Sequence, residues 1–435
     1  MSGLPKFDLD DIRRLLPSFL AKQRWYSGGE PDTIGIEQDE QLHDRMLWLL
    51  VDADGKRYQV PVGGCATSAP PDFLHGHDAS IVGASNDVLL YDATLDPELA
   101  TALLSVVAPD EDVTYVRPMG AEQSNTSLVF DDRLVLKVFR RVHDGANPDI
   151  EVTAALGGVG FKHVAAPVGV WERDQRHLAV VQPYLQGATD GWALALTSLR
   201  DLYASEHIDD PAQAGGDFGA EARRLGEVTA AMHVALARAF GTDKADVGQW
   251  VGVMLRQLER VGAEQPWRSQ AEKVFQSFAS LANRGPSIRV HGDYHLGQAV
   301  RTDAGWFVLD FEGEPARPLA ERRLPSSPLK DVSGMLRSFH YAAEVALRER
   351  EETDVKRLRP LARAWEQRNR KKFLDGYLAT DGIDELLGGN EKDTEAALNA
   401  WELDKAVYEV GYELGHRPDW VAIPESAVLR ILEEE

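Results

Sequence analysis

The chain contains the stretch Val290-His291-Gly292-Asp293-Tyr294-His295-Leu296-Gly297-Gln298, followed by Leu309-Asp310-Phe311-Glu312-Gly313. Apolar runs at 288–290 and 306–311 predict a short strand leading into each stretch, and together they predict one hairpin. Each stretch therefore places a carboxylate at the end of a strand. Phosphoryl transfer from ATP needs one carboxylate that takes the proton of the attacking hydroxyl and another that holds Mg²⁺. The two stretches indicate that chemistry.

The spacing of the acidic and amide side chains points the same way. Protein kinases carry a catalytic Asp, an amide five residues later and a downstream Asp-Phe-Gly. Asp293 and Gln298 are also five residues apart, and Asp310 follows after a strand-length spacer. We therefore predict Asp293 as the catalytic base, with Gln298 and Asp310 as Mg²⁺ ligands. A solvated or capping role would explain one such aspartate but not both, and a divalent-metal hydrolase is the main alternative.

Length and charge narrow the class of protein. A chain of 435 residues exceeds the size of a single hydrophobic core, which predicts two or three subdomains. The formal net charge of −23 disfavours nucleic acid and anionic membranes as partners, because both attract basic surfaces. Cys65 is the only cysteine, which excludes an intrachain disulfide, and no stretch has the roughly 18 apolar residues of a membrane span. We expect a cytoplasmic protein that acts on a small molecule.

The hydrophobic pattern divides the chain into three parts. Residues 1–90 are predicted to form a separate small unit, with a helix over 8–22 and a hairpin turned by Asp52-Ala53-Asp54-Gly55. Residues 91–186 carry a second β pattern, and residues 187–435 are mainly helical. The predicted fold class is therefore α+β with two lobes and an additional N-terminal unit.

Further elements follow from the periodicity of the apolar residues. Strands are predicted at 45–51, 56–62, 113–119, 126–130, 134–139, 164–171 and 177–184, helices at 217–240, 267–283, 328–349, 356–380 and 393–414, and irregular structure at 63–83.

A lysine lies within one of the apolar strands. Lys137 interrupts the run from Leu134 to Phe139, and its ammonium is costly to bury unless it is paired. The phosphates of ATP together with a helix glutamate would pair it. Glu151, fourteen residues later in the first turn of a helix that Asn147 is predicted to cap, is the candidate. The alternative is a lysine on an edge strand that extends its ammonium to solvent.

Two other segments are candidates for nucleotide binding. The turn before the strand at 126–130 has no Gly-rich loop but is polar, with Ser124, Asn125 and Thr126. Their side chains and backbone N–H groups suit phosphate oxygens, although polar turns are common. Gln182 and Tyr184 close the β-rich part, where the backbone of a hinge between lobes would bind adenine. An ordinary strand end explains the same two residues.

These residues together resemble the aminoglycoside phosphotransferase-like kinases, and among them the actinobacterial maltokinases. The resemblance covers nearly the whole chain and implies a bilobal protein-kinase-like fold with an N-terminal cap subdomain, and ATP and Mg²⁺ as cofactors. Its specific motifs are Gln23-Arg24-Trp25-Tyr26, Ala121-Glu122-Gln123-Ser124-Asn125-Thr126-Ser127, Asp190-Gly191-Trp192-Ala193, Ser198-Leu199-Arg200-Asp201-Leu202, 291–298, 309–315, 327–332, 403–409 and His416-Arg417-Pro418.

The same resemblance implies maltose as the acceptor, converted to maltose 1-phosphate for α-glucan synthesis, and a functional link to trehalose and α-glucan enzymes. It places the sugar on the helical lobe, in contact with Asp293, His295, Lys405, Tyr408, Glu409, Tyr412 and Trp420. Tyr408 and Tyr412 are four residues apart and share a helix face. Packing against another helix explains such a face equally well.

The acceptor has alternatives. Some relatives with the same motifs phosphorylate glucosamine to glucosamine 6-phosphate, and carboxylates near the sugar would suit its ammonium. His340 stands where maltokinases carry an acid, and residues 63–77 differ from their usual cap, which weakens the case for maltose. An aminoglycoside-type antibiotic kinase would also keep Asp293 and Asp310. A non-catalytic pseudokinase is disfavoured, because it would be expected to have lost at least one of four residues that are all present here: Lys137, Asp293, Gln298 and Asp310. We expect maltose first and glucosamine as its close rival.

Overall fold

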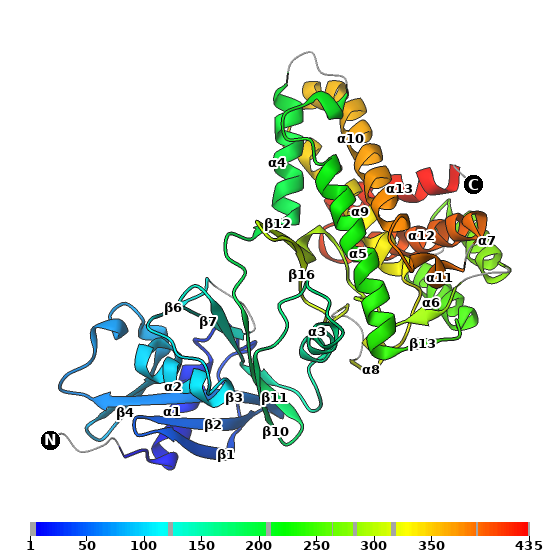
Figure 1. Ribbon diagram of the computed structural model, residues 1–435. Helices are drawn as coiled ribbons and strands as arrows, with labels where there is room; N and C mark the ends of the chain where they lie inside the picture. Colours follow the sequence, from blue (N-terminus) through cyan, green and yellow to red (C-terminus); the bar gives the residue numbers. More distant parts are fainter. Residues whose placement is uncertain are drawn as a thin grey trace. The chain divides into compact units, whose positions relative to one another are not determined.

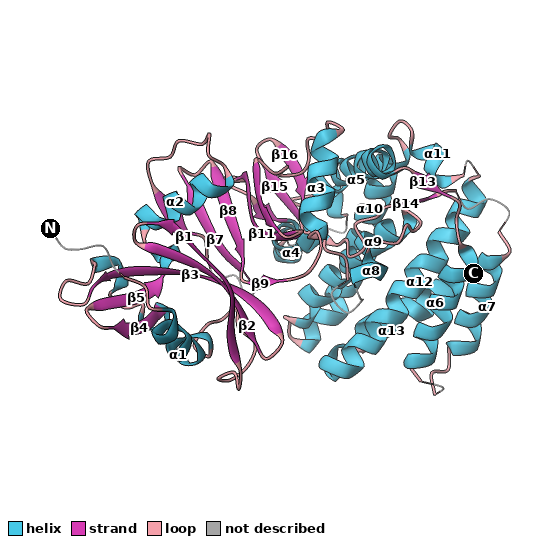
Figure 2. Cartoon of the chain, turned by 90° about the horizontal axis from the view of Figure 1, so that it is seen from below, coloured by secondary structure: helices cyan, strands magenta, loops and turns pink. Residues whose placement is uncertain are grey.

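The computed structural model divides into two compact units, residues 1–151 with 165–186 and residues 152–164 with 187–435 (Figure 1). Strands dominate the first unit and helices the second, as the α+β class predicts (Figure 2). The finer boundaries at residues 90 and 186 stay a prediction. Within the described residues, no helix is both long and apolar enough to cross a membrane. The described residues are 6–120, 125–205, 210–262, 264–281, 285–314, 319–388 and 390–433.

The first unit contains two antiparallel sheets. One has the order β1-β2-β3-β5-β4, with β9 also pairing β3, and the other has the order β10-β11-β8-β7-β6. The strands are β1 (Ile34–His43), β2 (Met46–Ala53), β3 (Lys56–Ala66), β4 (Ile81–Ser85), β5 (Val88–Asp92), β6 (Val116–Pro118), β7 (Asn125–Phe130), β8 (Leu134–Phe139), β9 (Arg141–Val142), β10 (Gly169–Arg173) and β11 (Arg176–Pro183). The helices that begin in this part of the chain are α1 (Leu9–Leu20), α2 (Pro97–Val107) and α3 (Pro148–Gly158).

Local chemistry explains the predicted turns and caps. The hairpin between β2 and β3 turns at Asp54 and Gly55, both with positive φ, and the Asp52 carboxylate accepts from the Gly55 N–H at 3.1 Å. Asn147 caps α3 by accepting from the Asp149 N–H at 2.8 Å. Both predictions are confirmed. Segment 63–83 is more ordered than expected, because β3 continues to Ala66 and β4 begins at Ile81.

Strand β2 is buried on both of its faces. Leu47, Leu49 and Val51 pack in a core with α1, whereas the alternate residues Met46, Trp48 and Leu50 pack in a second core. That second core also contains residues of α2 and of the other sheet. The two sheets of this unit therefore share one hydrophobic core.

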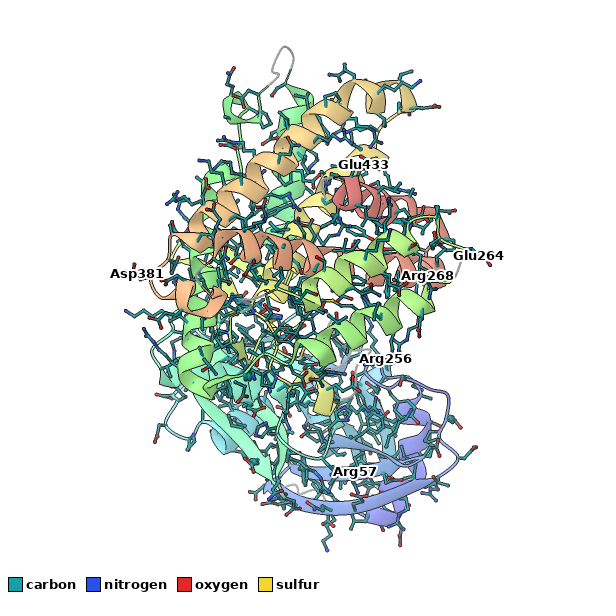
Figure 3. The ribbon with its side chains drawn as sticks, turned by 90° about the vertical axis from the view of Figure 1, so that its right-hand side faces the viewer. Arg57, Arg256, Glu264, Arg268, Asp381 and Glu433 are labelled. Atoms are coloured by element: carbon teal, nitrogen blue, oxygen red, sulfur yellow. The ribbon has the colours of Figure 1, made fainter. Side chains whose placement is uncertain are left out.

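The second unit is a set of packed helices with short strands. Charged side chains such as Glu264, Asp381 and Glu433 lie on its exposed surface (Figure 3). Its helices are α4 (Gly191–Ala204), α5 (Gly219–Phe240), α6 (Val247–Arg260), α7 (Arg268–Ala279), α8 (Leu319–Arg322), α9 (Leu329–Arg348), α10 (Glu352–Leu378), α11 (Ile383–Leu387), α12 (Glu391–His416) and α13 (Ala422–Glu433). Its strands are β12 (Thr189–Asp190), β13 (Thr242–Asp243), β14 (Ser287–Ile288), β15 (Ala299–Thr302) and β16 (Gly305–Val308).

Helices α5 and α10 run side by side (Figure 1), and two glycines set their separation. A Cβ on Gly226 of α5 would lie 2.0 Å from the carbonyl oxygen of Phe373 in α10. A Cβ on Gly376 of α10 would lie 2.1 Å from the carbonyl oxygen of Arg223 in α5. The two backbones therefore approach more closely than any other residue type permits.

The hairpin expected between 288–290 and 306–311 is wrong. Strand β14 pairs with β13, and the strand that pairs with β16 is β15, which also pairs with β12. The prediction missed β15 because it is short and Arg301 interrupts its apolar pattern. The hairpin that is present joins the two chemical motifs directly, since Gln298 precedes β15 and Asp310 follows β16.

Candidate active site

The loop 291–298 is held by a buried carboxylate that the sequence interpretation did not assign to the site. Asp331, in the first turn of α9, accepts from the backbone N–H groups of His291 at 2.8 Å and Gly292 at 2.9 Å. Its Oδ2 also lies 3.2 Å from Nε2 of His233 in α5, whose Nδ1 lies 2.8 Å from the hydroxyl of Tyr377 in α10. Burial raises the pKa of Asp331, but the hydrogen bond and charge of His233 hold it below the ordinary value. The loop is thus anchored to three helices.

His291 connects this loop to the end of the hairpin. Its Nε2 donates to the carbonyl oxygen of Leu309 at 2.8 Å, and its Nδ1 accepts from the Asp293 N–H at 3.4 Å. The ring packs 4.8 Å from that of Phe311, measured between centroids. One imidazole therefore contacts the residues on either side of Asp310 and the backbone of Asp293.

The structure brings Gln298 and Asp310 together. Nε2 of Gln298 donates to Oδ2 of Asp310 at 3.0 Å, and the carbonyl oxygen of Gln298 accepts from the Leu309 N–H at 2.9 Å. Asp310 has φ of 61°, a left-handed conformation that is uncommon for residues other than glycine and often marks functional sites. Its carboxylate is exposed. A carboxylate with a neighbouring amide supplies the oxygen donors that Mg²⁺ prefers, but the role remains a prediction.

A partly buried lysine contacts the predicted base. Lys405 of α12 has its Nζ 3.3 Å from Oδ1 of Asp293 and 3.5 Å from Oε1 of Glu314. Burial lowers the pKa of Lys405, but the charges of Glu314 and Asp293 outweigh that effect and raise it above the ordinary value. The ammonium therefore stays charged and orients the Asp293 carboxylate. His295 follows nearby, with its pKa lowered by burial, so its ring is neutral at pH 7.

A small pocket adjoins this lysine. Gly292, Glu314, Trp401, Asp404, Lys405 and Tyr408 are among the residues that line it. Glu314 and Asp404 are buried, and Gln257 donates to Oδ1 of Asp404 at 3.1 Å. The indole N–H of Trp401 is buried and has no hydrogen-bond partner within the described residues. Two carboxylates and an ammonium thus line one small pocket, which therefore carries charges of both signs.

The predicted nucleotide-binding residues lie in the first unit. Lys137 is in β8, and its Nζ lies 5.8 Å from the centroid of the Phe139 ring. Within the described residues, Lys137 and Glu151 do not form an ion pair with each other. Gln182 donates to the carbonyl oxygen of Ala165 at 2.8 Å, and the Tyr184 hydroxyl lies 3.3 Å from Nη2 of Arg117. Asn125 and Thr126 begin β7, whereas Ser124 lies outside the described residues. The nucleotide roles of these residues stay predictions.

Comparison with known proteins gives the chain a family. The profile of the phosphotransferase enzyme family (APH) matches residues 116–365, and that of the maltokinase N-terminal cap domain matches residues 19–96. The chain belongs to the phosphotransferase enzyme family. This assignment confirms the predicted family and places Asp293, Gln298, Asp310 and Lys137 within the matched region.

Glucosamine kinases are among the similar proteins. The enzyme of Streptacidiphilus jiangxiensis is 29% identical over 405 residues, with 88% of this chain and 87% of the relative covered. That of Mycolicibacterium smegmatis is 30% identical over 334 residues, with 73% and 80% covered. A solved glucosamine kinase in complex with glucosamine, ADP and inorganic phosphate has a TM-score of 0.72 at 25% identity, with 99% of this chain and 100% of that chain covered. The predicted kinase-like fold is thereby confirmed.

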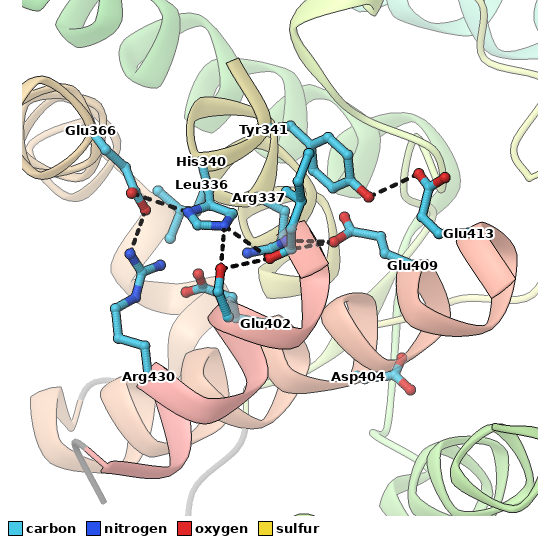
Figure 4. Close-up of polar contacts among 12 residues, drawn as sticks. Leu336, Arg337, His340, Tyr341, Glu366, Glu402, Asp404, Glu409, Glu413 and Arg430 are labelled. Atoms are coloured by element: carbon cyan, nitrogen blue, oxygen red, sulfur yellow. Dashed lines mark hydrogen bonds and ion pairs between the residues drawn. The ribbon is translucent and has the colours of Figure 1, made fainter. Parts of the chain in front are cut away.

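The structure separates several residues that the family resemblance had grouped around the sugar. Tyr408 lines the pocket, but Oε2 of Glu409 is bound to Arg337 at 2.6 Å and 2.9 Å (Figure 4). Tyr412 is 44% exposed and stacks on His416, with 4.3 Å between ring centroids. The Trp420 ring lies 4.6 Å from the guanidinium of Arg417 and 5.0 Å from that of Arg348. Glu409, Tyr412 and Trp420 are not among the residues that line the pocket beside Lys405.

His340, which departs from the maltokinase pattern, lies in a buried polar network. Its Nδ1 is 3.1 Å from Oε2 of Glu366, and Arg430 is 2.9 Å from the other oxygen of that carboxylate (Figure 4). Burial raises the pKa of Glu366, but the hydrogen bond and charge of His340 outweigh it and lower the pKa to about 2. His340 therefore joins α9 to α10 and does not line the pocket beside Lys405.

Proposed function

We propose that this phosphotransferase transfers the γ-phosphate of ATP to glucosamine, giving glucosamine 6-phosphate. The observation that carries the proposal is the pair of buried carboxylates that line the pocket, Glu314 and Asp404. Glu314 lies 3.5 Å from the Lys405 ammonium, and Asp404, which is 6% exposed, accepts from Gln257 at 3.1 Å. Two buried carboxylates that share a pocket with Lys405, the lysine that contacts Asp293, favour a cationic amino sugar over a neutral one. The glucosamine kinases among the relatives support the same acceptor, which we now place ahead of maltose.

The residues divide the chemistry among them. Asp293 takes the proton of the acceptor hydroxyl. The hydroxyl oxygen bonds to the γ-phosphorus while the bond from that phosphorus to the β–γ bridging oxygen breaks. Lys405 orients the Asp293 carboxylate at 3.3 Å. Asp310 and Gln298 would hold Mg²⁺, which neutralises phosphate charge when bound. Lys137, paired with Glu151, is proposed to bind the phosphates of ATP together with Asn125 and Thr126. The hinge at Gln182 and Tyr184 is proposed to bind adenine. We place this reaction in the cytoplasm.

Maltose is the second candidate, because the maltokinase cap profile matches residues 19–96. A link to trehalose and α-glucan enzymes belongs to that candidate alone. ADP release with Mg²⁺, ATP and a panel of glucosamine, maltose, glucose and aminoglycosides separates the acceptors. Turnover of glucosamine far above that of maltose is expected. Turnover of maltose with no turnover of glucosamine would reverse the order, and turnover of aminoglycosides alone would indicate an antibiotic kinase.

Asp404 and Glu409 make a matched pair for testing amine recognition. Asp404→Asn is expected to reduce kcat/KM for glucosamine by about 1.5–3 kcal/mol, the range of a charge-assisted hydrogen bond, and to change that for glucose much less. Glu409→Gln removes the charge that faces Arg337, so it is expected to affect both sugars alike. Steady-state kinetics with both sugars check this. If Glu409→Gln instead lowers kcat/KM for glucosamine and not for glucose, Glu409 binds the ammonium.

Lys137→Ala tests the nucleotide side. The expected result is a rise in KM for ATP with a much smaller change in KM for the sugar, because the ammonium is assigned to the phosphates. Lys137→Met is the matched control, since it keeps the apolar stem that lies beside Phe139 and removes only the charge. Measurement of both KM values decides the matter. A selective rise in the sugar KM would remove Lys137 from the nucleotide site.

A further inference from the structure

The motif Gln23-Arg24-Trp25-Tyr26 has no part in the site described above. In the structure it follows α1, and the Trp25 ring packs between those of Phe19 and Tyr58, at 6.3 Å and 6.0 Å between centroids. The guanidinium carbon of Arg140 lies 5.0 Å from the centre of the same Trp25 ring. The motif therefore supports an arginine that immediately follows β8.

Arg140 connects three separate segments of the first unit. It is 1% exposed, and its Nη2 donates to Oδ2 of Asp92 at 2.6 Å and to Oγ1 of Thr94 at 3.0 Å. Its Nε donates to Oγ1 of Thr126 at 2.7 Å. Asp92 ends β5 and Thr94 follows it, both within the region that the cap profile matches, whereas Thr126 is the second residue of β7. One buried guanidinium thus joins the cap to the start of β7.

The hydrogen bond from Arg140 determines how the Thr126 hydroxyl can bind other groups. A hydroxyl has one proton to donate and lone pairs that accept. Because the lone pairs face the Arg140 guanidinium, the proton of Thr126 is directed to another acceptor. Polarisation by a cation also strengthens that donation. The side chain is only half-buried, so a ligand can reach it. A directed O–H donor at the start of a strand suits a phosphate oxygen.

A further atom marks Arg140 as more than an ion-pair partner. Its Nη1 is buried and has no hydrogen-bond partner within the part of the chain that the structure describes. Buried donors without a partner are rare and often mark a functional constraint. The charge of Arg140 is already balanced by Asp92 at 2.6 Å. An apolar residue could fill the same space, but it would not hold Asp92 and Thr126 together.

We propose that Arg140 is a positioning residue for nucleotide phosphate binding, because it holds the Thr126 hydroxyl as a donor and joins it to Asp92, Thr94 and Trp25 of the cap. Through this side chain the cap acts on nucleotide affinity. This inference rests on the proposed kinase function, since it assigns the phosphates of ATP to Thr126. Arg140 itself acts through Thr126 and does not contact the phosphates.

Binding of MgADP and of adenosine to the purified full chain tests this, because adenosine lacks phosphate. Thr126→Val and Arg140→Met are each expected to raise the dissociation constant of MgADP about tenfold, the loss typical of one charge-assisted hydrogen bond, and to leave that of adenosine unchanged. Thr126→Ser, which restores the hydroxyl, is expected to recover most of the loss. KM for ATP is expected to rise while KM for the sugar stays.

A double variant and a control variant make the test specific. If Arg140 acts through Thr126, Thr126→Val with Arg140→Met loses no more MgADP affinity than either alone. Trp48→Phe is the control, since it removes the buried hydrogen bond from Trp48 to Gln59 at 3.0 Å in the same unit. This variant is expected to lower the melting temperature without changing the dissociation constant of MgADP.

Three results would overturn the inference. They are equal losses for MgADP and adenosine, additive losses in the double variant, and a Thr126→Ser variant no better than Thr126→Val. If Arg140→Met does not fold, the two Thr126 variants still decide the matter. Binding of MgADP without phosphorylation of any sugar in the panel would refute the proposed function and leave this inference standing. Absence of nucleotide binding by the unmodified chain would refute both.

Discussion

Replacement of Asp293 by asparagine is expected to lower kcat by about 10²–10⁴-fold, the usual cost of losing a general base. The isosteric amide cannot take the proton of the acceptor hydroxyl. The loop keeps its position, because it is held through the backbone of His291 and Gly292 by Asp331 and not through the Asp293 side chain. Lys405 also keeps its second carboxylate, Glu314, at 3.5 Å. KM for ATP is therefore expected to change little.

Single-turnover and steady-state assays on Asp293→Asn check this result. Thermal unfolding of the variant is the control for folding. A matched variant, Lys405→Met, removes the cation that orients the carboxylate and keeps Asp293 itself. It is expected to lower kcat less than Asp293→Asn does. A near-normal kcat in Asp293→Asn would assign the base to another residue.

Asp310→Ala is expected to abolish measurable turnover and to weaken the binding of ATP only when Mg²⁺ is present. The reason is that Asp310 contributes the charge that holds the metal, and the metal in turn holds the phosphates. Calorimetry of ATP binding with and without Mg²⁺ measures the difference. An unchanged Mg²⁺-dependent affinity would contradict the assignment of Asp310 as the metal ligand.

The left-handed backbone at Asp310 calls for a second variant. Alanine at φ of 61° is strained, so Asp310→Ala changes both the backbone and the charge. Asparagine tolerates that conformation and removes only the charge. Asp310→Asn is therefore expected to lose Mg²⁺-dependent ATP binding while its melting temperature stays close to that of the unmodified chain. A loss seen in the alanine variant alone would be a backbone effect.

Local features of the site were accessible from sequence, because they depend on neighbours along the chain. The Asp54–Gly55 turn and the Asn147 cap each involve residues a few positions apart, and the structure confirms them. Gln298 and Asp310, which were predicted to bind the same metal, lie together in the structure, although the hairpin that joins them was not predicted. The family and the kinase-like fold followed from the same motifs.

Contacts between distant segments were not accessible in the same way. Asp331 lay in a recognised motif, but its bonds to the loop and to His233 depend on helix packing that no local pattern contains. Glu409 was predicted to contact the sugar, and the structure places Arg337, seventy-two positions earlier, against its carboxylate. Arg140 and Asp92 are likewise forty-eight positions apart. Burial turns these side chains into partners, and burial is a property of the whole fold.

The close crossing of α5 and α10 has a consequence for how activity is lost under random mutagenesis. Tyr377, next to Gly376, is bonded to His233, and His233 is bonded to the carboxylate that anchors the catalytic loop. Any side chain at Gly226 or Gly376 pushes the two helices apart, because the backbone atoms that it meets cannot move away. This separation lengthens the hydrogen bonds from Tyr377 to His233 and from His233 to Asp331. A library selected for intact folding but failed turnover should therefore be enriched in changes at these two glycines, although neither touches a substrate.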